Sequence, residues 1–355
     1  MIEQVIGSLT NGWITLCSYL AEHVVTCLIP AFFIAGAIAT FVRKDGVLKY
    51  FSPDAKKTVS YGIASVSGTI LAVCSCTILP MFAGILKKGS GIGPAITFLY
   101  AGPAINILAV IYTAKVLGPD IGIARAISAI VLSIVIGLIM TSLFRDHDEK
   151  REAGRKDIYV STGKRESPWW VVPVFFIFLV SILLIATSQL DMLNRLFIVY
   201  ILSMAVSFLL IFYFTRDEVT EWGYEIWDLA KKIFPILLTG TFALGMISYF
   251  LPPEFFKPFI GDNSLFSNFI AAFLGAILYM PTLLEVPVIG TTFGYLSGNM
   301  AKGPALALLL SGPGISLPSL LVLSRIMGNK KTGVYATLVI VFSTLAGFIF
   351  GNSGL

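Results

Sequence analysis

The amino-acid sequence predicts an all-α, polytopic membrane protein, and three observations carry that prediction. Of its 355 residues, 56% are hydrophobic and only 13% are charged, whereas a soluble domain is close to a quarter charged. Long stretches contain no charge, and most reach the roughly 20 residues that a helix needs to cross about 30 Å of hydrocarbon. The alternating segments of about ten residues that are typical of transmembrane β-barrels do not occur.

The charge-free stretches locate the expected membrane-spanning helices. Residues 1–22 carry apolar side chains at helical spacing and predict an interfacial amphipathic helix before the first span. Residues 222–229 predict a second helix of this kind before a later span. Uninterrupted spans are expected over about 24–42, 122–144, 169–190, 195–215, 233–251 and 332–351.

Two regions, 58–117 and 263–325, do not fit a series of plain helices. Each is too long for two helices and a short turn, and each is interrupted by glycine and proline. Three features recur with the same order in both halves of the chain: Pro30 with Pro235, Gly68 to Pro80 with Gly275 to Pro287, and Pro94 to Gly102-Pro103 with Pro304 to Gly312-Pro313. Their ordered agreement predicts an internal duplication.

Basic residues set the orientation of these segments, because cytoplasmic loops are enriched in Lys and Arg. The loop 43–57 has five basic residues and the polar segment 145–167 has seven, so both are expected inside. The region 58–117 must then cross the bilayer an odd number of times. A re-entrant hairpin with its tip at 74–77, followed by one crossing, satisfies this. The same argument predicts a second hairpin, tipped at 281–285, that enters from the opposite face.

The expected architecture is an inverted repeat with two re-entrant hairpins, broken helices and about eight full transmembrane helices. A first repeat covers 1–144, a cytoplasmic loop 145–167, two inserted spans 168–215, and a second repeat 216–355. Inverted repeats with discontinuous helices are a common plan of secondary transporters, which bind substrate near the midplane. The residues expected to break the helices are Pro80, Gly102, Pro103, Pro281, Pro287, Gly312 and Pro313.

Cys74 and Cys76 stand at the tip of the first expected hairpin. Thiolates are soft ligands that suit Cu(I), As(III) and similar thiophilic species. A thiol pair can also take part in thiol–disulfide exchange. Cysteine is equally a well-tolerated small residue of apolar cores, so packing alone is the third interpretation.

Glu285 is the only charged residue between Asp262 and Lys302. An ionisable side chain at membrane depth indicates a functional site by default, and desolvation favours its protonated form. We therefore expect Glu285 to bind and release a coupling proton. The alternative is a structural carboxylate that accepts hydrogen bonds from neighbouring backbone N–H groups.

Other polar residues fall beside the expected breaks. Asn106 follows the first Gly-Pro pair, and Ser316 holds the matching place after the second. Together with Thr77 and Thr282, they are expected to line a substrate cavity next to the two thiols. The alternative role of such residues is to form hydrogen bonds between helices.

The sequence contains no phosphate-binding motif and no metal-ligand cluster, so we expect no cofactor, no metal and no enzyme activity. The net charge of +5 lies in loops, where it reports topology and not affinity for nucleic acid. The expected partners are the lipid bilayer and a small-molecule substrate. The oligomeric state stays open, with a homodimer among the alternatives.

The residues Cys74-Ser-Cys-Thr-Ile-Leu-Pro80 and Phe98-Leu-Tyr-Ala-Gly-Pro-Ala-Ile-Asn106 resemble the predicted-permease family that contains ArsP and YraQ. The run Gly84-Ile-Leu-Lys-Lys-Gly89 between them adds to the resemblance, which covers nearly the whole chain. It implies an eight-span permease in the cell membrane of a bacterium or archaeon. The ArsP branch exports trivalent organoarsenicals.

This chain departs from the ArsP branch at two motifs. It has Thr77 where ArsP-type members have Gly, and Ala-Gly-Pro-Ala-Ile-Asn where they have a motif of the Thr-Pro-Glu-Thr-Gly type. It is therefore closer to the YraQ branch, and arsenic transport is not carried over from the resemblance.

The leading hypothesis is a secondary permease that binds its substrate between the two hairpin tips. It would move a small thiophilic, or sulfur- or metalloid-containing, solute by alternating access, with proton coupling at Glu285. The second hypothesis is a membrane thiol-redox protein that exchanges reducing equivalents with a thioredoxin-like partner through Cys74 and Cys76. A purely structural membrane component is the third.

Overall fold

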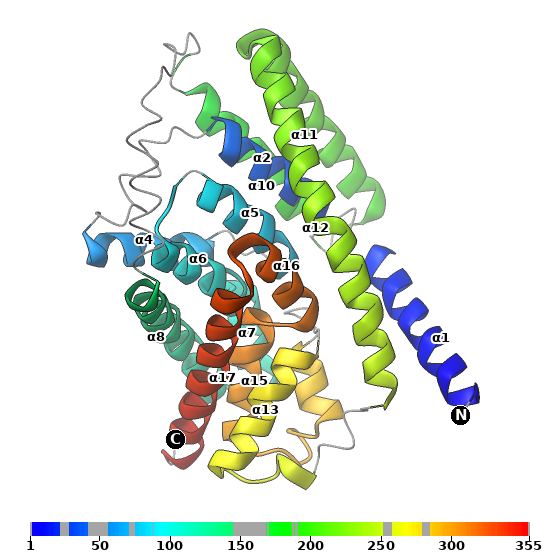
Figure 1. The fold of residues 1–355 in the computed structure, drawn as a ribbon, viewed down its shortest axis with the longest axis vertical. Helices are drawn as coiled ribbons and strands as arrows, with labels where there is room; N and C mark the ends of the chain where they lie inside the picture. Colours follow the sequence, from blue (N-terminus) through cyan, green and yellow to red (C-terminus); the bar gives the residue numbers. More distant parts are fainter. Residues whose placement is uncertain are drawn as a thin grey trace.

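The computed structural model describes residues 2–21, 28–41, 56–70, 75–87, 89–144, 168, 170–186, 188, 191–250, 258–278 and 285–353. In this part of the chain the secondary structure is helical, without a strand. The helices (Figure 1) are α1 (Ile2–Tyr19), α2 (Ile29–Phe41), α4 (Lys57–Ile70), α5 (Ser75–Lys87), α6 (Ile92–Ala104), α7 (Ile107–Val116), α8 (Pro119–Leu143), α10 (Val171–Ala186), α11 (Met192–Tyr213), α12 (Arg216–Phe250), α13 (Leu265–Ile277), α14 (Glu285–Pro287), the π-helix η3 (Val288–Thr292), α15 (Lys302–Gly314), α16 (Leu317–Met327) and α17 (Asn329–Asn352).

Among the described residues, α8, α11 and α17 are long and apolar enough to cross a membrane alone. Two bent pairs, α6 with α7 and α15 with α16, raise the number of candidate spans to as many as five. Shorter apolar helices include α2, α10 and α13. The prediction of an all-helical, polytopic membrane protein is therefore confirmed, and the number of about eight crossings stays a prediction.

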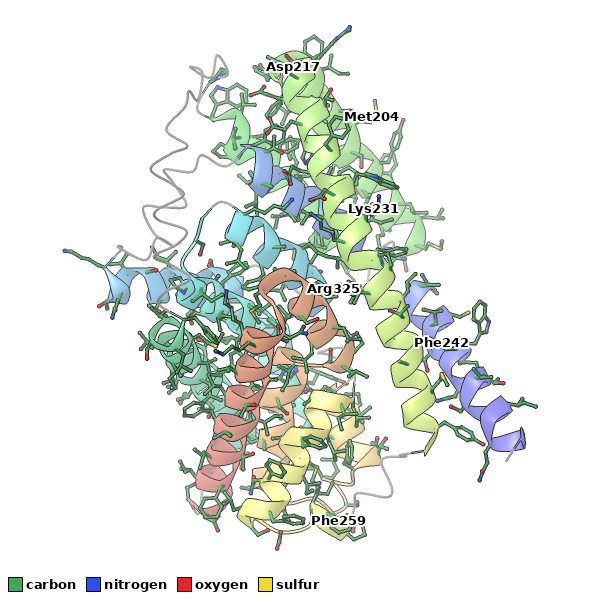
Figure 2. All side chains as sticks on the ribbon, in the orientation of Figure 1. Met204, Asp217, Lys231, Phe242, Phe259 and Arg325 are labelled. Carbon is green, nitrogen blue, oxygen red and sulfur yellow. The ribbon has the colours of Figure 1, made fainter. Side chains whose placement is uncertain are left out.

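The outer surface of α11 is apolar, as expected of a helix that faces lipid. Leu193 is 82% exposed and Ile211 is 74% exposed, and Met204 projects outward from the same helix (Figure 2). Side chains of this kind are covered by acyl chains when a protein is embedded in a bilayer.

One prediction about α12 differs from the structure. The sequence suggested an amphipathic lead-in over 222–229 and a separate span from 233, but residues 216–250 form one helix. Pro235 lies inside it, and no glycine or turn-forming residue separates the two parts to end the helix. Figure 2 shows the change of character along α12, from the polar Asp217 and Lys231 to the apolar Phe242.

The segment from α1 to α2 follows α12 from the end of that helix toward its start. Ser8 Oγ donates a hydrogen bond to Met246 O at 3.1 Å, and Asn11 Nδ2 donates to Gly245 O at 2.7 Å. Further along the chain, Trp222 Nε1 donates to Phe33 O at 3.1 Å. As the residue number rises from α1 to α2, the residue number of the hydrogen-bond partner in α12 falls. Thus α1, which was expected at the membrane interface, lies against the apolar half of α12 (Figure 1).

Two groups of helices pair in the same way. In the first half, α4 packs against α6, and α6 and α7 pack against α8. In the second half, α13 packs against α15, and α15 and α16 pack against α17. The helices α6 and α15 have equal lengths of 13 residues, and the interval that separates them also separates the starts of α7 and α16 and of α8 and α17.

Glycines at corresponding places allow these close approaches. A methyl group added at Gly93 would lie 2.7 Å from Gly137 O, and one added at Gly303 would lie 2.7 Å from Gly347 O. Both pairs therefore bring helix backbones into direct contact, and any side chain would separate them.

A second pair of glycines begins the last helix of each group. Gly118 and Gly328 have φ values of 126° and 88°, in the region that side chains disfavour. Each stands directly before its helix, α8 or α17, and turns the chain into it.

The centre of the molecule is formed by α6 and α15. Every residue of α6 from Ile92 to Ala104 is buried, and so is α15 from Gly303 to Gly314. Tyr100 Oη donates a hydrogen bond to Leu310 O at 3.0 Å where these helices meet. The two broken helices thus touch one another inside the protein.

Candidate functional site

Each broken helix ends shortly after its Gly-Pro pair. Gly102-Pro103 lies in the last turn of α6 and Gly312-Pro313 in the last turn of α15. The chain leaves the helix at 105–106 and at 315–316, and the axes bend by 43° and 45°. The breaks therefore lie two residues beyond the glycine-proline pairs at which they were predicted. The reason is that a proline in the last turn leaves carbonyls of the turn before it without a helical donor.

Arg125 lies inside α8 and is fully buried. The helix begins at Pro119 after Gly118, so Arg125 falls about 7.5 Å along its axis from Asp120. Gly122 allows α7 to approach α8, because a methyl group there would lie 2.6 Å from Ala114 Cβ. This approach brings Thr113 of α7 within reach, and Arg125 Nη1 donates to Thr113 Oγ1 at 2.9 Å.

Glu285 is the first residue of α14 and is also fully buried. Its Oε2 atom lies 3.3 Å from Arg125 Nη2, which makes an ion pair between the two halves of the chain. Its Oε1 atom lies over Gly312 of α15, where an added methyl group would overlap it. The carboxylate therefore needs the absence of a side chain beside the break in α15.

The ion pair is only partly satisfied. Arg125 Nε and Glu285 Oε1 have no hydrogen-bond partner among the described residues. Burying two charges costs several kcal/mol for each ion, and their attraction offsets this best when the remaining donors and acceptors are also paired. A pair that is buried yet incompletely bonded is more typical of a functional site than of a purely stabilising contact.

Two buried tyrosines surround the junction of the broken helices. Tyr100 lies against Gly314, since a methyl group added there would be 2.7 Å from its ring. Tyr335 of α17 donates a hydrogen bond to Gly314 O at 2.9 Å. That carbonyl has no helical donor because residue 318 is proline. The hydroxyl of Tyr335 therefore satisfies one carbonyl that the break leaves open.

The residues that the sequence suggested as substrate ligands are only partly described. Thr77 is buried in α5, Asn106 is buried after α6, and Ser316 is buried before α16. Ser316 Oγ shares a hydrogen bond of 2.8 Å with Ser319 Oγ. Cys74 and Thr282 lie outside the described residues, and Cys76 is placed only as backbone in α5.

The remaining predicted breaks differ from one another. Pro80 lies inside α5, which continues through it, because one missing N–H removes a single bond from a helix that is buried from Thr77 to Leu86. Pro287 stands where α14 passes into the π-helix η3. Pro281 lies outside the described residues.

Sequence reasoning identified Glu285 but missed Arg125 and Thr113. Glu285 was described as an isolated carboxylate, whereas the structure pairs it with Arg125. A signal was present: Arg125 is the only charged residue between Asp120 and Arg145, inside a stretch that begins with a Gly-Pro helix start. The expected span over 122–144 contained it without using it.

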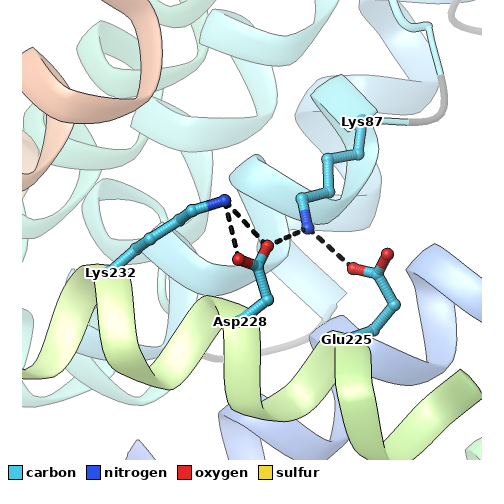
Figure 3. A network of polar contacts seen from close by, with 4 residues as sticks. All are labelled: Lys87, Glu225, Asp228 and Lys232. Carbon is cyan, nitrogen blue, oxygen red and sulfur yellow. Dashed lines mark hydrogen bonds and ion pairs between the residues drawn. The ribbon is translucent and has the colours of Figure 1, made fainter.

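Two further sets of ion pairs join the halves at the ends of the broken span α6–α7. Before this span, Lys87 Nζ contacts Glu225 at 2.7 Å and Asp228 at 2.8 Å, and Lys232 also contacts Asp228 (Figure 3). After it, Lys302 Nζ contacts Asp120 at 2.6 Å. Lys232 and Lys87 lower the pKa of the Asp228 carboxyl by hydrogen bonding.

The chain is similar in sequence to proteins of a predicted-permease family. Residues 10–352 match the family model ArsP_1, described as a predicted permease. The UPF0718 protein MJ0584 of Methanocaldococcus jannaschii is 40% identical over 351 residues, which cover 95% of this chain and 94% of that protein. The UPF0718 protein YraQ of Escherichia coli is 22% identical over 275 residues, 78% of this chain and 63% of that protein. No solved structure matches.

The fold and the buried site define a multi-pass membrane protein built around paired broken helices. The chain belongs to the predicted-permease family, since the family model covers nearly all of it. This membership supports a membrane transporter or permease rather than an enzyme, and it gives no support to the thiol-redox hypothesis.

Proposed function

We propose that this protein is a secondary permease of a prokaryotic inner membrane. It moves a small thiophilic, or sulfur- or metalloid-containing, solute by alternating access and couples the movement to protons through Glu285. The observation that carries the proposal is the buried ion pair between Arg125 and Glu285, which joins the two halves beside a helix break. Intramembrane ionisable pairs at discontinuous helices are the usual place for substrate and proton binding in transporters.

An inverted duplication is the frame of this proposal. Matching helix intervals, matching glycine contacts and the two positive-φ glycines support the duplication. The segment from α1 to α2 follows α12 from its end toward its start. This course supports the inversion, because segments that correspond across a two-fold axis in the membrane plane must run in opposite directions. The contact of Tyr100 with Leu310 joins corresponding residues of α6 and α15.

Alternating access needs contacts that close each side of the membrane in turn. The pair Asp120–Lys302 and the cluster of Lys87 with Glu225 and Asp228 join the halves at opposite ends of α6–α7. Both sets are partly exposed, so each contributes little stability and can separate at low cost. We assign them to the two closures, with the Arg125–Glu285 site enclosed between them.

Cys74 and Cys76 enter the proposal as thiol contacts to the solute. The helix α5, which includes Cys76, packs against α16, the segment after the break in α15. The corresponding helix in the second half, α14, packs against α7 in the same crossed manner. Both helices therefore lie against the broken helix of the other half, where an alternating-access site would bind its substrate.

The test is transport by the purified full chain in proteoliposomes, with arsenite as the thiophilic probe and thiosulfate as the sulfur-containing probe. We expect accumulation of one of them that depends on a proton gradient. Cys74→Ser with Cys76→Ser should reduce uptake of a thiophilic probe, and Glu285→Gln should remove the gradient dependence. The matched control is Glu221→Gln on the exposed side of α12. Transport that survives Cys74→Ser, Cys76→Ser and Glu285→Gln in one variant would exclude this site.

A further inference from the structure

The Arg125–Glu285 pair has unused hydrogen-bonding capacity on both partners. Arg125 donates to Thr113 Oγ1 through Nη1 and to Glu285 Oε2 through Nη2, and its Nε–H has no partner among the described residues. The contact to Glu285 is single and long, at 3.3 Å, whereas a saturated Arg–carboxylate pair is commonly bidentate and shorter. Thr113 Oγ1 donates its own proton to Ala109 O at 2.7 Å. Toward the guanidinium of Arg125, Thr113 Oγ1 therefore acts only as a hydrogen-bond acceptor.

The elements packed around the pair add no further charge in contact with it. Tyr100 of α6 interacts electrostatically with both groups, and α15 presents Gly312. From α17, Tyr335 is bonded to Gly314 O, and from α4, Tyr61 is bonded to Thr141. The other charged or titratable residues of α4, α7, α8, α15 and α17 are exposed or partly exposed: Lys57, Tyr112, Lys115, Asp120, Lys302, Lys330 and Lys331.

Electrostatics then restricts what this site can accept. The pair is neutral overall, and an added charge in a low-dielectric site needs compensation. Arginine does not lose its proton in proteins, whereas a buried carboxylate can take one. A cation bound to Glu285 would leave two positive charges facing one negative charge. A monovalent anion bound to Arg125 can instead be matched by a proton on Glu285, which restores neutrality.

We infer that the Arg125–Glu285 pair is a binding site for one small anion taken up together with one proton. The anion replaces Glu285 as the partner of Arg125 and accepts from its free Nε–H and from Nη2. The displaced carboxylate takes the proton from the aqueous side that is open at that moment. Release reverses both steps: the proton leaves Glu285 and the ion pair forms again. This inference rests on the proposed permease function and names its substrate class and its stoichiometry.

Proteoliposomes that contain the full chain provide the main test. The probes are radiolabelled thiosulfate, sulfate, phosphate and chloride, with arsenite as a probe that is uncharged at neutral pH. For a monovalent anion, an external pH one unit lower than the internal pH should give about tenfold accumulation, because one pH unit per coupled proton corresponds to a factor of ten. A shift in membrane potential alone should leave this accumulation unchanged.

Two substitutions separate the roles of the pair. The Glu285→Gln variant has no carboxylate that could release a proton or neutralise Arg125 when the site is empty, so the empty carrier cannot return across the membrane. Net uptake should therefore fall at least tenfold, while anion exchange across the membrane continues. Arg125→Lys keeps the charge but loses the planar set of donors, and exchange and uptake should both fall. Glu221→Gln and Arg325→Lys, at exposed positions of α12 and α16, are the matched controls.

A measurement on the unmodified protein covers the case in which these variants do not fold. Mixing an anion with the purified protein in weakly buffered detergent solution should remove about one proton from solution for each anion bound. Anion binding without proton uptake would overturn the inference, as would gradient-driven accumulation by Glu285→Gln. Transport of arsenite with no response to any of the anions would also overturn it but leave the permease function standing. Failure of all probes would remove both.

Discussion

Corresponding positions of the two halves carry different chemistry in the same frame. Arg125 stands in α8 where Tyr335 stands in α17, and Thr113 stands in α7 where Leu323 stands in α16. Glu285 precedes Pro287 by the interval that separates Ile78 from Pro80. Apart from the two prolines, all of these side chains are buried. One contact region between the halves therefore holds an ion pair, and the corresponding contact region is formed by a tyrosine and two aliphatic residues.

The difference indicates that the frame and the site are separable. The matching glycines hold helices together in both halves, whereas the charged residues occur once. Tyr335 uses its hydroxyl to satisfy the open carbonyl of Gly314, a local task of the helix break. Arg125 instead reaches Glu285 across the boundary between halves. In the inverted duplication that we propose, a single charged site would serve one substrate path shared by the two halves.

The largest expected effect comes from breaking the ion pair. Arg125→Met leaves Glu285 buried without its partner, and removal of one member of a buried pair typically costs about 3–5 kcal/mol. The free energy of unfolding, measured by SDS titration in mixed micelles, should fall by this amount. The double variant Arg125→Met with Glu285→Leu should regain much of the loss, because no unpaired charge remains.

The corresponding change in the other half should be milder. Tyr335→Phe leaves Gly314 O without its donor, and a buried unsatisfied group costs about 1–3 kcal/mol. If Tyr335→Phe destabilises the protein more than Arg125→Met does, the functional contrast between the two positions is wrong.

The glycine contacts of the frame should behave alike in both halves. Gly137→Ala would press a methyl group against Gly93 O at 2.9 Å, and Gly347→Ala would press one against Gly303 O at 2.6 Å. Overpacking of this kind costs about 1–3 kcal/mol, so both variants should lose stability by similar amounts in the same unfolding assay. Gly62→Ala in α4 is the control, since nothing lies within 4 Å of its added methyl group. A large loss in only one of the two variants would show that the halves are not equivalent in packing.

A glycine at the site links the frame to the charge pair. Gly312→Ala should displace Glu285 Oε1 and lengthen its contact with Arg125. The displaced atom is the end of a side chain, so we expect a loss near the low end of overpacking, about 1 kcal/mol, with a larger relative effect on transport. Gly333→Ala in α17 has open space and should be neutral or stabilising by about 0.5–1 kcal/mol. Equal transport by the two variants would contradict the proposed place of Glu285.

The sequence predicted the parts of the fold that depend on local properties. Hydropathy located α8, α11 and α17 within a few residues, because a membrane span needs a long apolar segment wherever it packs. The recurrent Gly-Pro pairs indicated where the two broken helices end, since proline acts on the turn before it. The continuity of α12 was missed, because a basic pair and a proline resemble a boundary when the packing of the helix is unknown.

The site was predicted from one side only. The carboxylate of Glu285 was identified by the cost of a lone charge in an apolar stretch. Its partner Arg125 obeys the same rule, but their contact joins residues far apart in the chain, and no local pattern encodes that distance. Gly312 was taken as a helix breaker, whereas the structure also uses its missing side chain to seat the carboxylate.

The smallest expected effect concerns the exposed cluster at the end of α5. Lys232 and Lys87 lower the pKa of Asp228 in the folded protein, so the cluster stabilises the fold above the unfolded value of about 3.9. This stability should be lost as the pH falls through the lower, folded pKa of Asp228. Because these side chains are partly exposed, the loss should be less than about 1 kcal/mol. The free energy of unfolding should fall between pH about 6 and 3 more in the wild type than in Asp228→Asn, and the difference between the two decreases should be this amount. A cluster that instead changed stability as strongly as Arg125→Met would be a structural anchor, and its assignment as a contact that opens during transport would be wrong.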